Sequence, residues 1–273
     1  MSWSTRHGFT LTEVLVVIGI CVIVVGLMLP SVRRVREPAN RTRCQNNLRQ
    51  VMIALQNYCD VSQPVPNISA GQPSIGQHFP TGCQGGGDTP EGRFSWMVAV
   101  LPMLEQDSLF RQFDFEKGYT ANLASSQTVI KSFLCPAAKE DGNGDMVTHY
   151  VAMAGIGHDA ATRPARAVGN GFMGYDRYTS NAMIEDGTSN TIALAETRAN
   201  LGPWARGGAS TVRGFEPTEI PVQYDGRPFG GHASGMIVAL ADCSTRSVSM
   251  MISAKTLAAA ITIADKEELG TDW

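Results

Sequence analysis

The sequence predicts an α+β fold in which a long amino-terminal helix packs on a mostly antiparallel sheet, with short helices and long Gly/Pro-rich loops. Helical patterns dominate the first 59 residues, and short apolar segments with strand character occur only from residue 150 onward. Helices followed by strands, rather than alternating with them, are typical of α+β proteins.

The first predicted element is an apolar helix over 9–29. Residues 14–29 carry no charge, and a helix over 9–29 would be about 31 Å long, close to the thickness of a bilayer core. No small-x-small cleavage site follows this run. We therefore expect the segment to be retained as a membrane helix rather than removed as a secretory signal. Glu13 lies at its edge, where an acidic group usually has a partner.

The helix is expected to continue as a soluble half over 30–59. Its apolar stripe has helical spacing and consists of Cys44, Leu48, Val51, Leu55 and Tyr58. Such a stripe most often packs on the core of a domain, here the one expected over 60–273.

The remaining elements are predicted from periodicity and from turn residues. Irregular loops are expected at 60–93 and 200–232, where glycine and proline are dense. The other expected elements are a helix over 95–113 interrupted at Pro102, an amphipathic segment over 126–134, strands at 150–154 and 191–195, a hairpin of 236–241 with 246–252, and a closing helix over 256–264.

Composition restricts the function classes. The formal net charge of −3 gives no basis for nucleic-acid binding. Six cysteines are present, of which Cys21 lies in the apolar run and the other five lie outside it, so the sequence leaves the disulfide pairing open. The sequence contains no CxxC pair and no His/Cys cluster with zinc spacing, and it therefore predicts no structural zinc site.

The charges on either side of the apolar run indicate which side of the membrane the domain would lie on. The arginines that follow the run are Arg33, Arg34, Arg36, Arg41 and Arg43, whereas only Arg6 and His7 precede it. The positive-inside tendency would place the domain that follows in the cytoplasm.

The sequence offers weak signs of catalysis. His232 and Asp242 could imitate a catalytic pair, with Ser234 or Ser244 as the nucleophile, but neither serine lies in a Gly-x-Ser-x-Gly elbow. We interpret these residues as structural and predict that the protein is not an enzyme. Glu196, which follows an apolar strand, is interpreted as a carboxylate at the edge of the core with a partner.

A glycine-rich loop is the best metal candidate in the sequence. Asp141, Asn143 and Asp145 place oxygen ligands at alternating positions, as in the first half of an EF-hand loop. Met146 and Ala152 stand where that loop has glycine and a bidentate glutamate, so the motif is incomplete. A calcium site and a solvated turn both remain open, and no other cofactor is expected.

The beginning of the chain carries a recognisable motif. Residues 8–15 read Gly-Phe-Thr-Leu-Thr-Glu-Val-Leu and resemble the cleavage and methylation motif of type IV prepilins and type II secretion pseudopilins. The resemblance implies a leader at 1–8, cleavage after Gly8 by a prepilin peptidase at the cytoplasmic face, and methylation of Phe9. It also implies assembly with other pilin or pseudopilin subunits, in which Glu13 faces the terminal ammonium of a neighbour.

A second resemblance covers nearly the whole chain. Motifs occur in the order found in the pilin-associated proteins of domain of unknown function 1559, and their central residues are Cys44, Asn46, Asn47, Cys135, Asp186 and Gly187. That family usually ends in a histidine, nine residues, then Asp-Gly. Here His232 and Asp242 have this spacing, but Cys243 replaces the glycine. Glycine tolerates a positive φ and cysteine does not, which puts the turn geometry in question.

The two resemblances imply a structural subunit. It would span the inner membrane once, contact membrane lipid, and display its domain in the periplasm or on an extracellular filament. This orientation is opposite to the one indicated by the arginines, and we give the motif more weight because a specific enzyme reads it. The alternative is a membrane-tethered periplasmic module that binds a solute or polysaccharide, with Trp96 and Trp204 in the surface formed by the loops at 60–93 and 200–232.

Overall fold

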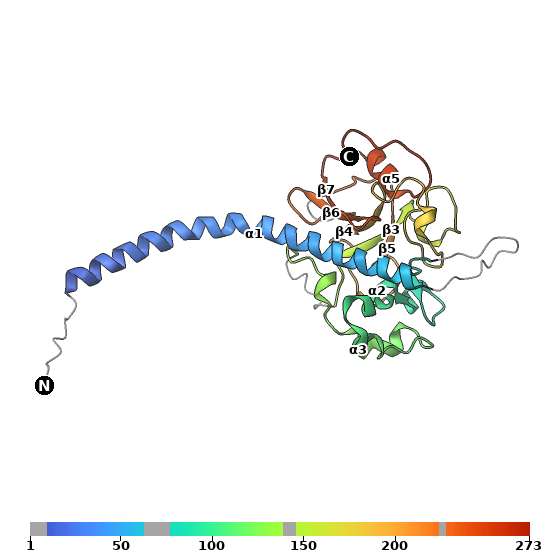
Figure 1. Ribbon diagram of the computed structural model, residues 1–273, viewed down its shortest axis with the longest axis horizontal. Helices are drawn as coiled ribbons and strands as arrows, with labels where there is room; N and C mark the ends of the chain where they lie inside the picture. The colour runs from blue at the N-terminus through green and yellow to red at the C-terminus, as the bar shows by residue number, and fades with distance from the viewer. Residues whose placement is uncertain (1–9, 63–76, 139–145, 224–227) are drawn as a thin grey trace. The chain divides into compact units, whose positions relative to one another are not determined.

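The computed structural model describes residues 10–62, 77–138, 146–223 and 228–273, with the backbone alone described at 24–36. It confirms the α+β class. The chain forms two compact units, Met1–Asn40 and Arg41–Trp273, and Figure 1 shows the strands and short helices gathered in the second unit.

The long helix α1 (Leu11–Val61) contributes to both units. The predicted stripe on its second half is confirmed, because Cys44, Leu48, Val51 and Leu55 are fully buried and Tyr58 packs against the same core. Within the described residues, no helix is long and apolar enough to cross a membrane. The span expected at 9–29 lies partly outside them, because Phe9 and the side chains of 24–29 are not described.

A five-stranded mixed sheet forms the centre of the second unit within the described residues. Its strands are β3 (Tyr150–Ile156), β4 (Ile192–Glu196), β5 (Val212–Phe215), β6 (Gly235–Leu240) and β7 (Thr245–Ser249). They lie in the order β5-β3-β4-β6-β7, and every neighbouring pair is antiparallel except β3 with β5. The predicted hairpin is therefore confirmed as β6 and β7.

The two faces of the sheet pack against different helices. Tyr150, Ala152 and Ala154 of β3 belong to the core that contains the α1 stripe. Val151 and Met153 belong to a second core, which includes side chains of α5 (Ala254–Ile261). Successive side chains of a strand point to opposite faces, so this alternation places the sheet between α1 and α5.

The interruption predicted at Pro102 within the helix at 95–113 is confirmed, but the helical parts are shorter than expected. The chain forms α2 (Trp96–Ala99), η2 (Leu101–Leu104) and α3 (Asp107–Phe110). Pro102 lies at the start of η2, where its missing N–H cannot continue the preceding helix. Glu105 then adopts a left-handed φ of 61° and ends η2. The other short elements are β1 (Cys83–Gln84), η1 (Pro90–Gly92), β2 (Phe94–Ser95), η3 (Tyr119–Asn122), α4 (Leu123–Ser126), η4 (Lys131–Phe133), η5 (Ala160–Thr162) and η6 (Asn181–Met183).

The predicted loop at 200–232 contains a strand that the sequence did not reveal. Strand β5 pairs in parallel with β3, and Val212 lies opposite Ala152. Its four residues, Val-Arg-Gly-Phe, include a glycine and show no clear alternation, so the pairing depends on β3 rather than on local pattern. The described part of the other predicted loop, 77–93, is irregular apart from β1 and η1.

Candidate functional site

Helix α1 begins with a capping box. The Glu13 carboxylate accepts hydrogen bonds from the Thr10 backbone N–H at 2.8 Å and the Thr10 hydroxyl at 2.9 Å, and Thr10 Oγ1 accepts from the Glu13 N–H at 3.3 Å. This reciprocal arrangement satisfies N–H groups that have no partner within a helix. Sequence analysis missed this local role, although the Thr-x-x-Glu spacing signals it. Gly8 and Phe9 lie outside the described residues.

An exposed apolar surface follows the capping box. Nine apolar side chains between residues 11 and 23 are at least 47% exposed, namely Leu11, Val14, Leu15, Val16, Val17, Ile18, Ile20, Val22 and Ile23. Five consecutive residues, 14–18, extend through more than one helical turn, so this surface is apolar on all sides. A helix that is hydrophobic all round is normally covered by lipid or by other protein.

A disulfide joins the second half of α1 to the domain. Cys44 is bonded to Cys135 across a separation of 91 residues. One helical turn later, the Asn47 side chain donates a hydrogen bond to the Leu134 carbonyl at 2.9 Å and reinforces the same junction. Asn46, by contrast, is exposed. The sequence left this pairing open, because no spacing rule relates two cysteines so far apart.

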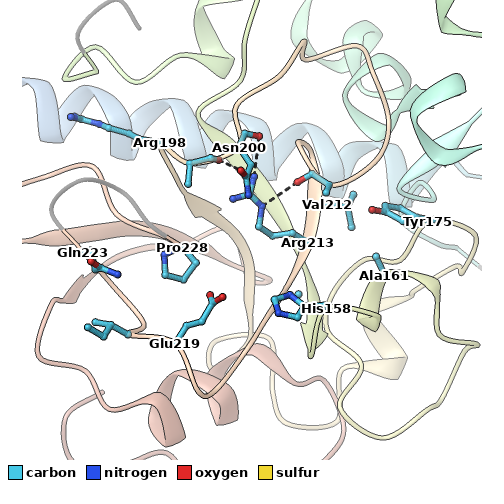
Figure 2. Close-up of a pocket in the computed structure, with 14 residues that line it drawn as sticks. His158, Ala161, Tyr175, Arg198, Asn200, Val212, Arg213, Glu219, Gln223 and Pro228 are labelled. Atoms are coloured by element: carbon cyan, nitrogen blue, oxygen red, sulfur yellow. Dashed lines mark hydrogen bonds between the residues drawn. The ribbon is translucent and has the colours of Figure 1, made fainter.

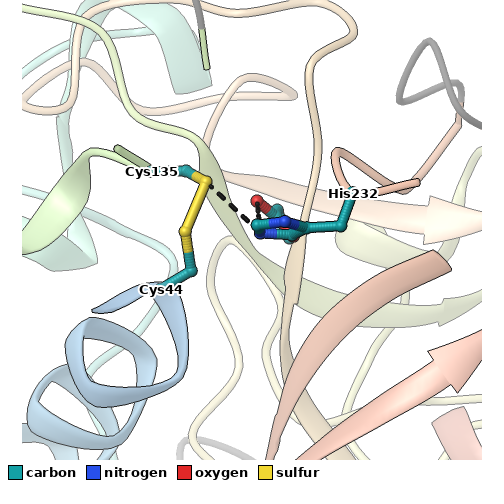
Figure 3. Close-up of side chains that lie close together, drawn as sticks. Cys44, Cys135 and His232 are labelled. Atoms are coloured by element: carbon teal, nitrogen blue, oxygen red, sulfur yellow. Dashed lines mark hydrogen bonds and ion pairs between the residues drawn. A yellow bond between two sulfur atoms is a disulfide. The ribbon is translucent and has the colours of Figure 1, made fainter. Parts of the chain in front are cut away.

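A buried histidine, His232, lies against this disulfide (Figure 3), and a buried glutamate lies beside the histidine. His232 Nε2 is 3.6 Å from Cys135 Sγ and 3.3 Å from Glu196 Oε1. Cys44, Cys135, Glu196 and His232 are at most 3% exposed, and one ligand-type atom from each lies within 4.8 Å of the others. We call these four residues the Cys–His–Glu cluster.

Four separate elements position the cluster. Cys44 lies on α1, Cys135 follows η4, Glu196 ends β4, and His232 precedes β6. His232 and Gly235 exchange backbone hydrogen bonds of 3.1 and 3.0 Å, which form a tight turn at the start of β6.

Glycine is needed beside this turn as well. A Cβ on Gly231 would lie 2.8 Å from Glu196 Oε1, and the backbone there has a φ of +151°. A side chain at this position would therefore displace the carboxylate from the cluster.

The Glu196 carboxylate makes few hydrogen bonds within the described residues. Its Oε2 accepts a long hydrogen bond of 3.4 Å from the Ile237 N–H, and its Oε1, which faces His232, has no hydrogen-bond partner. Burial raises the pKa of the neighbouring Tyr150 hydroxyl well above its usual range, and the Glu196 charge raises it further. The interpretation of Glu196 as a carboxylate with a partner is confirmed, but it lies inside the core rather than at its edge.

Two protein families match the sequence of this chain. The family described as "Protein of unknown function (DUF1559)" matches residues 33–219, and the "Prokaryotic N-terminal methylation motif" matches residues 3–29. The chain belongs to the DUF1559 family. The DUF1559 match includes Cys44, Cys135 and Glu196 of the cluster, and His232 lies beyond its end. No curated protein and no solved structure gives a significant match to the chain.

In this DUF1559 protein, Asp186 binds the segment that follows α5. Its carboxylate accepts hydrogen bonds from the backbone N–H groups of Lys266 at 2.8 Å and Asp265 at 3.1 Å. The next residue, Gly187, has a φ of 96°, which a side chain would strain. Both family-motif residues therefore hold the turn before β4 in place.

Asp242 and Cys243 shape the turn between β6 and β7. The Cys243 N–H donates to the Leu240 carbonyl at 3.0 Å, and the Asp242 carboxylate accepts from the Ser244 N–H at 2.9 Å. Cys243 has a φ of 67°, the left-handed conformation that follows the turn in a three-residue hairpin loop. The cysteine thus adopts a left-handed backbone conformation that glycine would favour at this position. Asp242 serves this turn, whereas His232 pairs with Glu196.

Replacing Cys243 with glycine is expected to stabilise the domain by about 1 kcal/mol, because left-handed strain of about 1–3 kcal/mol is relieved and is partly offset by glycine's greater freedom when unfolded. Urea unfolding followed by tryptophan fluorescence measures the change. Cys243→Ala is the matched control, since it removes the thiol but keeps Cβ. An equal gain from alanine would contradict the backbone explanation.

Two other predicted sites have different outcomes. Asp141, Asn143 and Asp145 lie outside the described residues, so the calcium site stays a prediction. Trp96 and Trp204 are fully buried, and their indole N–H groups donate to main-chain carbonyls. The prediction that they line a binding surface is wrong, because core side chains cannot stack on a ligand.

A cleft does form partly within the 200–232 segment. It has a volume of about 820 Å³ and surrounds Arg213 (Figure 2). The Arg213 guanidinium donates to the carbonyls of Ala209, Ala199 and Asn200 at 3.0–3.3 Å, and burial lowers its pKa to about 10. It is still charged at neutral pH, but it holds chain carbonyls together rather than presenting its donors to a ligand.

Proposed function

We propose that this DUF1559 protein is a pilin-like or pseudopilin-like structural subunit. It is cleaved after Gly8, methylated at Phe9, and assembles with other subunits through the first half of α1. The observation that carries the proposal is the exposed apolar helical surface over residues 11–23, which lies within the methylation motif matched at 3–29. Such a surface needs a covering partner.

Cleavage would create a charge close to Glu13. The new ammonium at Phe9 precedes Thr10, the residue whose N–H already binds the Glu13 carboxylate. In an assembly of packed helices this carboxylate would leave water, and a neighbour's ammonium would neutralise it. Removing one partner of a buried ion pair typically costs about 3–5 kcal/mol.

We further propose that the subunit is held at the inner membrane by its N-terminal segment, with its domain in the periplasm or on an extracellular filament. The Cys44–Cys135 disulfide supports this orientation, because disulfides persist in oxidising compartments outside the cytoplasm. It weighs against the orientation indicated by the five arginines after the apolar run. In this arrangement the protein's partners are prepilin peptidase, other subunits and lipid, and its role is structural rather than catalytic.

Mass spectrometry of the mature protein from native membranes tests the proposal. The expected chain begins at N-methylated Phe9. Gly8→Val is expected to abolish processing, because the peptidase motif requires a small residue at that position, and Thr5→Val within the leader serves as the control. A wild-type chain that still begins at Met1, or at an unmethylated Phe9, would contradict the proposal.

A further inference from the structure

We propose that the Cys–His–Glu cluster binds a zinc ion when Cys44 and Cys135 are in the dithiol form. The four ligands would be the two cysteine sulfurs, His232 Nε2 and Glu196 Oε1. This inference does not rest on the proposed assembly of the subunit.

The distances within the cluster match those of a tetrahedral site. Ligand atoms at 2.0–2.3 Å from zinc and at tetrahedral angles are about 3.3–3.8 Å from one another. His232 Nε2 lies 3.6 Å from Cys135 Sγ and 3.3 Å from Glu196 Oε1. Two edges of the tetrahedron are thus already present, and separation of the two sulfurs would open the remaining space between the ligands.

The polar atoms of the cluster also indicate a cation. Glu196 is fully buried, and its Oε1 makes no hydrogen bond and contacts His232 Nε2 at 3.3 Å. A buried carboxylate is costly unless its charge is neutralised, and a metal ion bound by both of these atoms would neutralise it.

The donor set selects the metal. Two thiolates and one imidazole suit zinc, whereas calcium and magnesium require oxygen ligands. Since the protein would supply all four ligands, the site would be closed and structural, without the open position that catalytic zinc sites keep. It would fix α1 to the sheet at the same point as the disulfide.

The disulfide and the zinc site use the same two sulfurs. A newly made chain holds both as thiols, and zinc binding releases their two protons as the thiolates coordinate the ion. An oxidant that itself contains a disulfide later accepts two electrons from these thiolates and is reduced to two thiolates. Cys44 and Cys135 then form their own disulfide, and the zinc ion is released. The cluster can therefore tie Cys44 to Cys135 both before and after oxidation.

Cobalt titration of the full-length chain in detergent tests the inference. One sample keeps the disulfide, and the other is reduced with a phosphine under argon. We expect one Co²⁺ per reduced chain, with a thiolate-to-cobalt charge-transfer band and tetrahedral d–d bands that zinc abolishes. The oxidised chain should bind none. Absence of these bands in a reduced chain whose six thiols all react with an alkylating agent after denaturation would overturn the inference.

Two ligand variants and one control assign the ligands. Glu196→Gln keeps the shape of the side chain and should weaken cobalt binding at least tenfold. Cys59→Ser is the control, because Cys59 is buried outside the cluster and burial raises the pKa of its thiol to about 11. Binding that survives Cys44→Ser, or that Cys59→Ser removes, would overturn the assignment. The comparison of reduced and oxidised wild-type chains is decisive even if Glu196→Gln fails to fold.

Discussion

Glu13→Gln is expected to abolish assembly while leaving cleavage after Gly8 intact. Glutamine can replace glutamate in a capping box, so the hydrogen bonds with Thr10 can persist and α1 can begin at the same residue. The neutral amide cannot, however, neutralise a neighbour's ammonium. A loss of about 3–5 kcal/mol at each contact would weaken association by at least two orders of magnitude.

Thr10→Val is the matched control for this prediction. It removes the hydroxyl that binds Glu13 but keeps the carboxylate charge, and losing a threonine cap typically costs a helix about 1 kcal/mol. Subunits in a sheared, pelleted filament fraction are measured beside the mature amino terminus of each variant. If Glu13→Gln assembled normally and Thr10→Val did not, capping rather than charge pairing would be the main role of Glu13.

The elements that follow a local hydrophobic pattern could be predicted from the sequence. The stripe at Cys44, Leu48, Val51 and Leu55 follows a helical period, and the hairpin of β6 and β7 follows two short runs on either side of a turn. Both are present. Strand β5 was missed because its partner decides its structure, since β5 pairs with β3 rather than following a local pattern. The interruption at Pro102 was predicted, whereas the short length of the helices on either side of it was not.

The candidate site was harder to predict than the fold. Cys44, Cys135 and His232 were identified by resemblance, and Glu196 by its position after an apolar strand, but no pattern in the sequence brings the four together. The four side chains lie close together because α1 packs on one face of the sheet and because β4 and β6 are neighbouring strands. The sequence contains one indirect sign of the cluster, which is the glycine at position 231 next to His232. Because Gly231 has no side chain, the Glu196 carboxylate can occupy the space beside it.

Reduction of the Cys44–Cys135 disulfide is expected to have the largest effect on stability. A cross-link that closes a loop of this length, with a separation of 91 residues, restricts the unfolded chain by about 4–5 kcal/mol in the chain-entropy treatment. Urea unfolding monitored through the buried Trp96 and Trp204 measures the difference between oxidised and reduced chains. An unchanged midpoint in a chain with both thiols free would contradict this expectation.

The double variant Cys44→Ser/Cys135→Ser separates the cross-link from other effects of the reductant. It should be less stable than the oxidised wild type by a similar amount, and reductant should not change it further. Cys59→Ser should retain the full response to reductant, because Cys59 is a free thiol outside the disulfide. If the cluster also binds zinc, added zinc should restore stability to the reduced wild type and not to the double variant, because binding to the folded state alone stabilises it.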